Sequence, residues 1–151
     1  MSFWLVKSEA QVYSIDSLRA DGTTLWDGVR NYQARNYLKA MQPGEPVLFY
    51  HSNSDPLAIV GLAEVAQSAQ PDPSQFDPDS PYYDPGADKD KPRWFSPLLR
   101  FKEKFSVPVT REMLLHTAAT REMILLQKGS RLSIQPVQEK EFEAVLALSV
   151  P

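Results

Sequence analysis

Apolar residues recur along the chain at two spacings, and the clearest pattern lies between residues 30 and 42. There the apolar positions follow one another at intervals of three and four, at Ala34, Tyr37, Leu38 and Met41. This spacing is typical of one face of an amphipathic helix. We expect Pro43 and Gly44 to end the helix, and Asp27 or Asn31 to cap its start through a side-chain oxygen.

Shorter apolar runs bounded by turn residues predict strands in the rest of the chain. These runs lie at residues 3–7, 46–51, 58–66, 93–107 and 131–135. Gly61, inside the third run, indicates a bulge or a close approach of another part of the chain. Residues 67–92 are rich in Pro, Asp, Ser and Gly, so we expect a long loop that packs on the body of the domain.

Short helices are expected between the strands. One is predicted at residues 13–19 with Ser14 as its cap, Thr110 and Thr120 are expected to cap two more, and Pro136 to begin a C-terminal helix. Together the elements predict an α+β fold, in which five or six strands curl into a small mixed β-barrel flanked by short helices. A doubly wound sheet would need longer helical crossovers.

Composition narrows the class of protein. The 151 residues are expected to form one domain, residues 1–151. A net charge of −3 argues against a strongly basic nucleic-acid coat, but it allows a pocket with a local basic rim. Because the chain has no cysteine, disulfides, thiolate catalysis and cysteine-based zinc sites are excluded. With no long apolar run and no signal peptide, we expect a cytoplasmic protein, nucleoid-associated if bacterial, that has no membrane partner.

No constellation of residues predicts catalysis, a metal ion or a cofactor. The two histidines are His51 and His116. His51 precedes Ser52, but there is no Gly-x-Ser-x-Gly elbow, and adjacent residues of a strand point to opposite faces. The Asp-rich loop lacks the Gly and the bidentate Glu of an EF-hand, and no phosphate-binding glycine motif is present. We therefore expect a protein that is not an enzyme and that has neither catalytic nor metal-binding residues.

The stretch from Trp26 to Asn36 carries the strongest functional signal. A Trp and a Gly precede a dense set of planar, hydrogen-bonding side chains, at Arg30, Asn31, Tyr32, Arg35 and Asn36. Aromatic rings stack on a nucleobase, Asn both donates and accepts, and Arg pairs with a phosphate or a base edge. The cluster favours a nucleobase-binding site over the alternative of a core Trp26 among solvated polar residues.

Several stretches, in order along nearly the whole chain, resemble the EVE domain family. They lie at residues 3–9, 26–36, 48–52, 59–65, 71–73, 82–84, 92–94 and 131–137. One departure is Ala10, where the family commonly has Pro after Lys-Ser-Glu. The resemblance implies a PUA-like barrel related to the YTH domain, which reads methylated adenine in RNA. It also implies a reader of modified bases, chiefly modified cytosines in DNA.

The resemblance and the residue chemistry together predict a pocket that receives a base after it leaves its stack. The base-pocket residues are expected to be Lys7, Ser8, Trp26, Asn31, Tyr32, Tyr50, Ser52 and Trp94. Trp26 would stack on the base, and a second aromatic wall would come from Tyr50, Tyr32 or Trp94. Tyr50 and Trp94 are equally compatible with a place in the barrel core. Flanking phosphates are expected to bind Arg30, Arg35 and Arg93.

Two other functions remain open at this stage. PUA-like domains also bind RNA, so a reader of modified RNA is one alternative, and a small nuclease is the other. The expected partner is a nucleic acid that carries a modified base, together with a separate nuclease or effector protein. The sequence does not define the oligomeric state.

Overall fold

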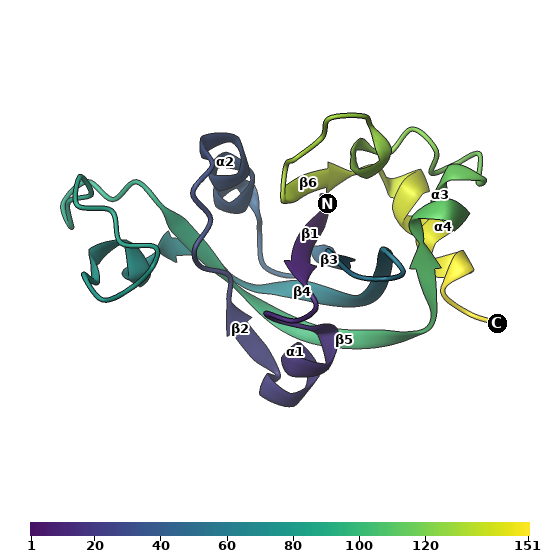
Figure 1. Cartoon of the computed structure of the whole chain (residues 1–151), viewed down its shortest axis with the longest axis horizontal. Helices are drawn as coiled ribbons and strands as arrows, with labels where there is room; N and C mark the ends of the chain where they lie inside the picture. Colours follow the sequence, from purple (N-terminus) through teal and green to yellow (C-terminus); the bar gives the residue numbers. More distant parts are fainter.

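An open six-stranded sheet organises the computed structural model, which describes residues 1–151 (Figure 1). The strands are β1 (Phe3–Glu9), β2 (Thr23–Leu25), β3 (Pro46–Ser52), β4 (Ala58–Pro71), β5 (Phe95–Thr110) and β6 (Ile134–Val137). Their order across the sheet is β2-β5-β4-β3-β1-β6, with β1 parallel to β3 and the other neighbours antiparallel. The predicted α+β fold, a PUA-like mixed architecture of five or six strands flanked by short helices, is confirmed with six strands. The sheet is not closed, because its edge strands β2 and β6 do not pair with each other.

Strands β4 and β5 form a long, irregular hairpin that sets the shape of the sheet. They have 14 and 16 residues, and their pairing shifts register at several points. A side chain at Gly61 would lie 2.6 Å from the Glu103 carbonyl oxygen and 2.6 Å from Cδ1 of Ile15, which confirms the predicted close approach. β4 continues to Pro71, so the long loop that follows begins later than the composition predicted. This loop projects from one end of the molecule (Figure 1).

Four α-helices and two 3₁₀ turns complete the fold. They are α1 (Ile15–Asp21), α2 (Tyr32–Ala40), α3 (Arg111–Leu115) and α4 (Glu139–Leu148), with η1 (Pro73–Phe76) and η2 (Ile124–Leu126). Ser14, Asn31 and Thr110 cap α1, α2 and α3 through their side-chain oxygens. None of the helices has the length and apolar character needed to cross a membrane.

Two predicted helix starts were wrong. Thr120 caps no helix, because its buried hydroxyl donates instead to the Leu114 carbonyl oxygen at 2.7 Å. Pro136 lies in β6, and α4 begins at Glu139 behind a capping box made by Gln138 and Glu141. Glu141, which an exposed helix face was expected to carry into water, is buried instead, and its carboxylate accepts from the Gln138 N–H at 2.8 Å.

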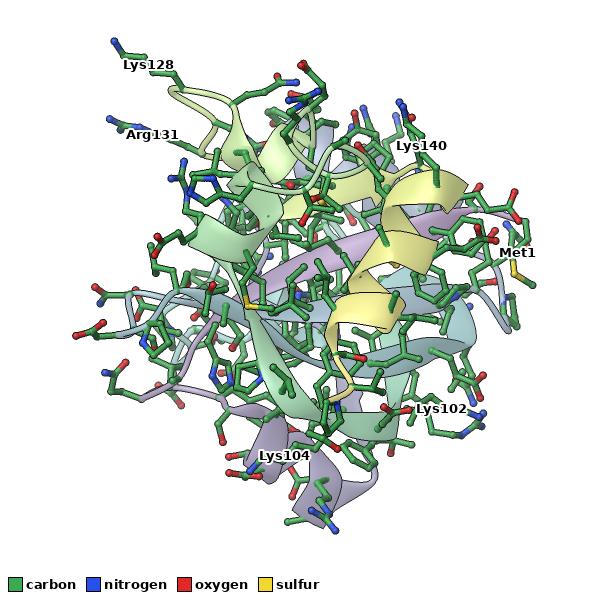
Figure 2. All side chains as sticks on the ribbon, turned by 90° about the vertical axis from the view of Figure 1, so that its right-hand side faces the viewer. Met1, Lys102, Lys104, Lys128, Arg131 and Lys140 are labelled. Carbon is green, nitrogen blue, oxygen red and sulfur yellow. The ribbon has the colours of Figure 1, made fainter.

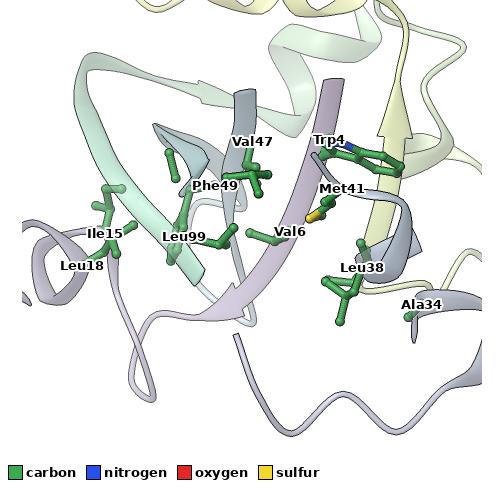
Figure 3. Close-up of a cluster of buried hydrophobic side chains, with 13 residues drawn as sticks. Trp4, Val6, Ile15, Leu18, Ala34, Leu38, Met41, Val47, Phe49 and Leu99 are labelled. Carbon is green, nitrogen blue, oxygen red and sulfur yellow. The ribbon is translucent and has the colours of Figure 1, made fainter. Parts of the chain in front are cut away.

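The sheet separates two clusters of buried apolar side chains, of 13 and 12 residues. Figure 3 shows the first, where Trp4 and Val6 of β1 meet Leu38 and Met41 of the α2 region. Leu5, between them on β1, belongs to the second cluster, since successive side chains of a strand point to opposite faces. The second cluster lies under α3 and α4, at the other end of the molecule from the long loop (Figure 1).

Candidate nucleobase-binding site

A cleft of about 530 Å³ opens beside the end of β1. Its walls come from five parts of the chain: the β1 end, the turn before α1, the segment from β2 to α2, the long loop, and the segment before β6. The lining residues are 7–9, 12–13, 24–31, Tyr82 and Ser133. Five predicted site residues are brought together here, namely Lys7, Ser8, Trp26, Arg30 and Asn31.

Trp26 forms the aromatic part of the wall. Its indole ring packs edge-on against Phe49 of the first cluster, with centroids 5.7 Å apart and an interplanar angle of 83°. Tyr13 contacts it in the same manner at 6.4 Å. The backbone N–H of Trp26 donates to the Pro97 carbonyl oxygen at 2.9 Å. The ring is therefore held on the core side while the half-buried residue also borders the cleft.

Asp72 ties the long loop to the rim of the cleft. Its carboxylate accepts from the Gly28 N–H at 2.8 Å and from Arg30 at 3.1 Å. Arg30 also donates to the Ser74 hydroxyl at 3.0 Å and to the Tyr82 carbonyl oxygen at 2.8 Å. The Tyr82 ring covers Gly28, where a Cβ atom would lie 2.8 Å from the ring, and Gly28 has a φ of 78°. Both the conformation and the contact at position 28 therefore require glycine.

The two carboxylates beside this rim have opposite shifts in pKa. Burial alone would raise the pKa of Asp72, but hydrogen bonds from Ser74, Gly28 and Arg30 outweigh it and lower the pKa. For Asp27, partial burial raises the pKa, and the nearby Asp72 carboxylate raises it further, while Arg30 opposes both. Asp72 is thus held as an anion by the fold, whereas Asp27 lacks comparable support.

The remaining predicted aromatic residues lie outside the cleft. Tyr32 stacks on Trp94 with ring centroids 5.0 Å apart and an interplanar angle of 24°. Trp94 is 6% exposed, and its indole N–H donates to Asp84 at 2.8 Å. Tyr50 is 4% exposed and belongs to the second buried cluster. Of the two possibilities left open for Tyr50 and Trp94, the structure places both in packed interiors.

The predicted residues at the ends of β1 and β3 divide between the two faces of the sheet. Lys7 pairs in register with Tyr50, and the adjacent pair is Ser8 with His51. Burial and then the nearby Arg111 guanidinium lower the pKa of Lys7. Leu5 belongs to the second cluster and Val6 to the first, so by the alternation of the strand the Lys7 side chain leaves β1 on the side of the second cluster. Ser52 ends β3 and does not line the cleft.

The three arginines expected to bind phosphate all have partners within the protein. Arg30 forms an ion pair with buried Asp72. Arg35 donates to the Arg93 carbonyl oxygen at 3.1 Å and lies over the Tyr32 ring at 4.8 Å. Arg93 lies 3.7 Å from the Asp84 carboxylate. Arg35 and Arg93 thus lie together beside the Tyr32–Trp94 stack, and neither lines the cleft.

Comparison with known proteins decides the family. The EVE domain pattern matches residues 2–148 of the chain. Human thymocyte nuclear protein 1 is 41% identical over 167 residues, which span 97% of this chain and 73% of that protein. The chain belongs to the EVE domain family. The resemblance predicted from the sequence motifs is confirmed.

Several solved structures are similar to this one. A protein from Pseudomonas syringae has a TM-score of 0.93 at 40% identity, with 98% of this chain and 99% of that chain covered. Human THYN1, solved in complex with 5-methylcytosine containing DNA, has a TM-score of 0.92 at 39% identity, with 99% and 98% covered. The YTH domain of Zygosaccharomyces rouxii MRB1 has a TM-score of 0.57 at 13% identity, with 99% and 87% covered. At that identity, the likeness to YTH concerns the fold alone.

Among the residues that line the cleft of this EVE domain and that sequence reasoning missed are Tyr13, Asp27 and Tyr82. Asp27 had been considered only as a helix cap, although it follows Trp26 directly. Tyr82 had a signal, because it lies in one of the family-like stretches, but the loop gave no indication of where it would fold. No group of three or more His, Cys, Asp or Glu side chains is placed to hold a metal ion.

Proposed function

We propose that this EVE domain reads a modified cytosine in DNA by accepting the base into the Trp26 cleft. The observation that carries the proposal is a cleft with an aromatic wall in a chain 39% identical to human THYN1, a protein solved in complex with 5-methylcytosine containing DNA. The two chains superpose over nearly their full lengths, so a shared site needs no rearrangement of the fold.

The geometry of the cleft supports this role. Its volume of about 530 Å³ lies within the range of small-molecule sites, so one base fits with room for its sugar. An exposed aromatic face contributes roughly 1–3 kcal/mol to each stacked base. A base in a duplex must leave its stack to reach such a cleft, as in other proteins that bind extruded bases.

The proposal describes a binding module, with no reaction assigned to it. We place its action in the cytoplasm, on the nucleoid if the protein is bacterial, with a separate nuclease or effector protein responding to the bound mark. Incubation of the protein with modified DNA, with and without a divalent metal ion, tests this part. Strand cleavage that depends on the purified chain would contradict it.

A binding screen tests the proposed reader directly. Oligonucleotides that differ only at one position should be compared, with 5-methylcytosine, 5-hydroxymethylcytosine or cytosine at that position, in DNA and in RNA. We expect tighter binding to a modified cytosine than to cytosine, and tighter binding to DNA than to RNA. Equal affinity for modified and unmodified DNA would overturn the proposal, and preference for modified RNA would favour the alternative RNA reader.

Trp26→Ala provides the matching test of the site. The variant should lose the preference for the modified base, while Tyr83→Ala, which removes an exposed ring outside the cleft, should keep it. Because Trp26 also packs on Phe49, the unfolding midpoint of each variant must be measured as well. A folded Trp26→Ala variant with unchanged preference would show that the base binds elsewhere.

A further inference from the structure

The cleft contains a carboxylate that the fold leaves without a partner. Asp27 lines the cleft directly after Trp26, its backbone N–H donates to the Leu25 carbonyl oxygen at 3.0 Å, and its carboxylate accepts no hydrogen bond from another residue. The nearest cation, Arg30, is engaged by Asp72, Ser74 and the Tyr82 carbonyl oxygen. The Asp27 carboxylate is therefore free to accept a hydrogen bond from a ligand.

Cytosine presents the donor that such a carboxylate needs. Its exocyclic amine at position 4 donates hydrogen bonds, whereas thymine has an acceptor oxygen at the same position. The 5-methyl group does not separate these bases, since 5-methylcytosine and thymine both carry it. An aromatic wall alone is also tolerant, because every base has a π-face. A reader of 5-methylcytosine therefore needs a group that recognises position 4.

We propose that Asp27 is this specificity-determining residue, accepting a hydrogen bond from the exocyclic amine of the bound base and rejecting bases with an oxygen there. This inference rests on the proposed function and adds the chemistry by which the base is identified. The hydrogen bond from the amine also compensates the Asp27 carboxylate for its partial burial, which raises its pKa in the free protein. Adenine also carries an exocyclic amine, so Asp27 separates amino bases from oxo bases, and the rest of the cleft separates pyrimidines from purines.

The test compares wild type, Asp27→Asn and the control Glu9→Gln, which neutralises another carboxylate of the same cleft. Each is titrated with DNA that carries 5-methylcytosine, cytosine or thymine at one position, as single strands and as duplexes. Thymine and cytosine pair differently with the opposite base of a duplex. This difference does not affect the comparison, because each variant and wild type are titrated with the same DNA. Asparagine can turn either its oxygen or its amide toward the base, so Asp27→Asn should lower the preference for 5-methylcytosine over thymine about tenfold.

The possible outcomes separate this inference from the proposed function. Preference of wild type for 5-methylcytosine over cytosine, with an unchanged ratio to thymine in Asp27→Asn, would overturn the role of Asp27 alone. A wild type that does not distinguish 5-methylcytosine from cytosine would overturn both. A fall of the ratio in Glu9→Gln equal to that in Asp27→Asn would also count against Asp27, since it would reflect the charge of the cleft as a whole.

A second, independent observation concerns the backbone of the nucleic acid. A groove of about 430 Å³ adjoins the cleft and shares Asn31 with it. It is lined almost entirely by polar residues of α2 and of the loop before β6, including Lys128 and Arg131. Both of these side chains extend into solvent from one loop (Figure 2), and neither takes part in an ion pair.

We infer that this groove binds a phosphodiester flanking the bound base. The arginines first expected to bind phosphate are held by internal contacts, whereas Lys128 and Arg131 are free and lie beside the cleft. The variants Lys128→Ala and Arg131→Ala should each weaken binding equally for modified and unmodified DNA. Each should also reduce the slope of log affinity against log salt by roughly 0.7–0.9, the value for one phosphate contact.

Lys140→Ala is the control, because Lys140 lies on α4 away from that loop (Figure 2). Salt slopes of Lys128→Ala and Arg131→Ala that match the slope of Lys140→Ala would overturn the groove assignment. The preference for a modified base, measured in the same titrations, would remain intact in that case. Failure of the groove is therefore distinguishable from failure of the proposed reader.

Discussion

The two buried clusters have nearly the same size but end differently at the surface. The second, of 12 residues, is covered by α3 and α4. The first, of 13 residues, has a border of half-buried aromatic side chains that includes Tyr13 and Trp26, both of which line the cleft. The two apolar clusters of this small fold therefore have different roles: one completes the packing of the core, and the other extends to a binding surface.

The regions also differ in how the chain around them is fixed. Around the second cluster, helices cover the sheet through apolar contacts. Around the cleft, the long loop is fastened by Asp72, Arg30 and the Tyr82 carbonyl oxygen. Polar contacts of this kind require defined positions, so they align the rim of a site where apolar packing would tolerate small shifts.

The largest expected effect comes from truncating a large buried side chain on either side of the sheet. Phe49→Ala should reduce the free energy of unfolding by about 3–5 kcal/mol, and Leu114→Ala in the second cluster by about 2–5 kcal/mol. Because Phe49 supports Trp26, only Phe49→Ala should also weaken DNA binding per folded molecule. Denaturant unfolding measures the stability of each variant, and titration with DNA well below the unfolding midpoint measures its binding. Equal loss of binding in both variants would remove the distinction between the clusters.

A smaller loss is expected when the loop anchor is changed. Asp72→Asn leaves Arg30 without its anionic partner, so we expect a loss of about 3 kcal/mol in unfolding free energy, the lower end for a broken buried pair. Asp77→Asn, at an exposed position of the same loop, should cost less than about 0.5 kcal/mol. Similar costs for the two variants would show that the loop is not anchored at Asp72.

The same anchor gives a dependence on pH. The folded pKa of Asp72 is lowered from 3.8, so its stabilisation is fully present above that value. It is lost as the pH falls through the lower pKa of the folded state. Unfolding measurements at decreasing pH should therefore bring wild type and Asp72→Asn together in acid, and a gap that widened in acid would contradict the assignment.

Two glycines with similar backbones provide the finest test. Gly28 and Gly44 have φ values of 78° and 89°, but only at Gly28 would a Cβ atom meet the Tyr82 ring. Gly44→Ala should cost about 1 kcal/mol for its conformation alone. Gly28→Ala should cost more and should also weaken binding, because it displaces Tyr82 from the rim. Equal unfolding midpoints for the two variants would show that the ring moves aside without loss.

Local interactions were predictable from the sequence, and contacts between distant residues were not. The Asn31 cap depends on a hydrogen bond to Ala34, three residues away, and was expected correctly. The three-residue strand β2 was missed because its partially exposed residues form a strand only by pairing with β5. Thr120 was mistaken for a helix cap because its residue type suits a cap. The sequence does not reveal that its hydroxyl donates to the Leu114 carbonyl oxygen.

The candidate site shows the same limit. Trp26 and Ser8 were expected to lie together, and family-like motifs on both segments made that possible. The partners of Arg30 lie 42 to 52 residues further along the chain, beyond the reach of any local pattern. Tyr50 could not be placed either, because its face of β3 depends on the register with β1.

The open mouth of the cleft makes this chain suited to optical measurement. Val12 lies on the rim and is 73% exposed, and the sequence contains no cysteine. A thiol introduced by Val12→Cys would therefore be the single reactive one in this chain, without prior removal of others. An environment-sensitive dye attached there would report the arrival of a base as a change in emission, so that the kinetics of recognition could be followed in real time.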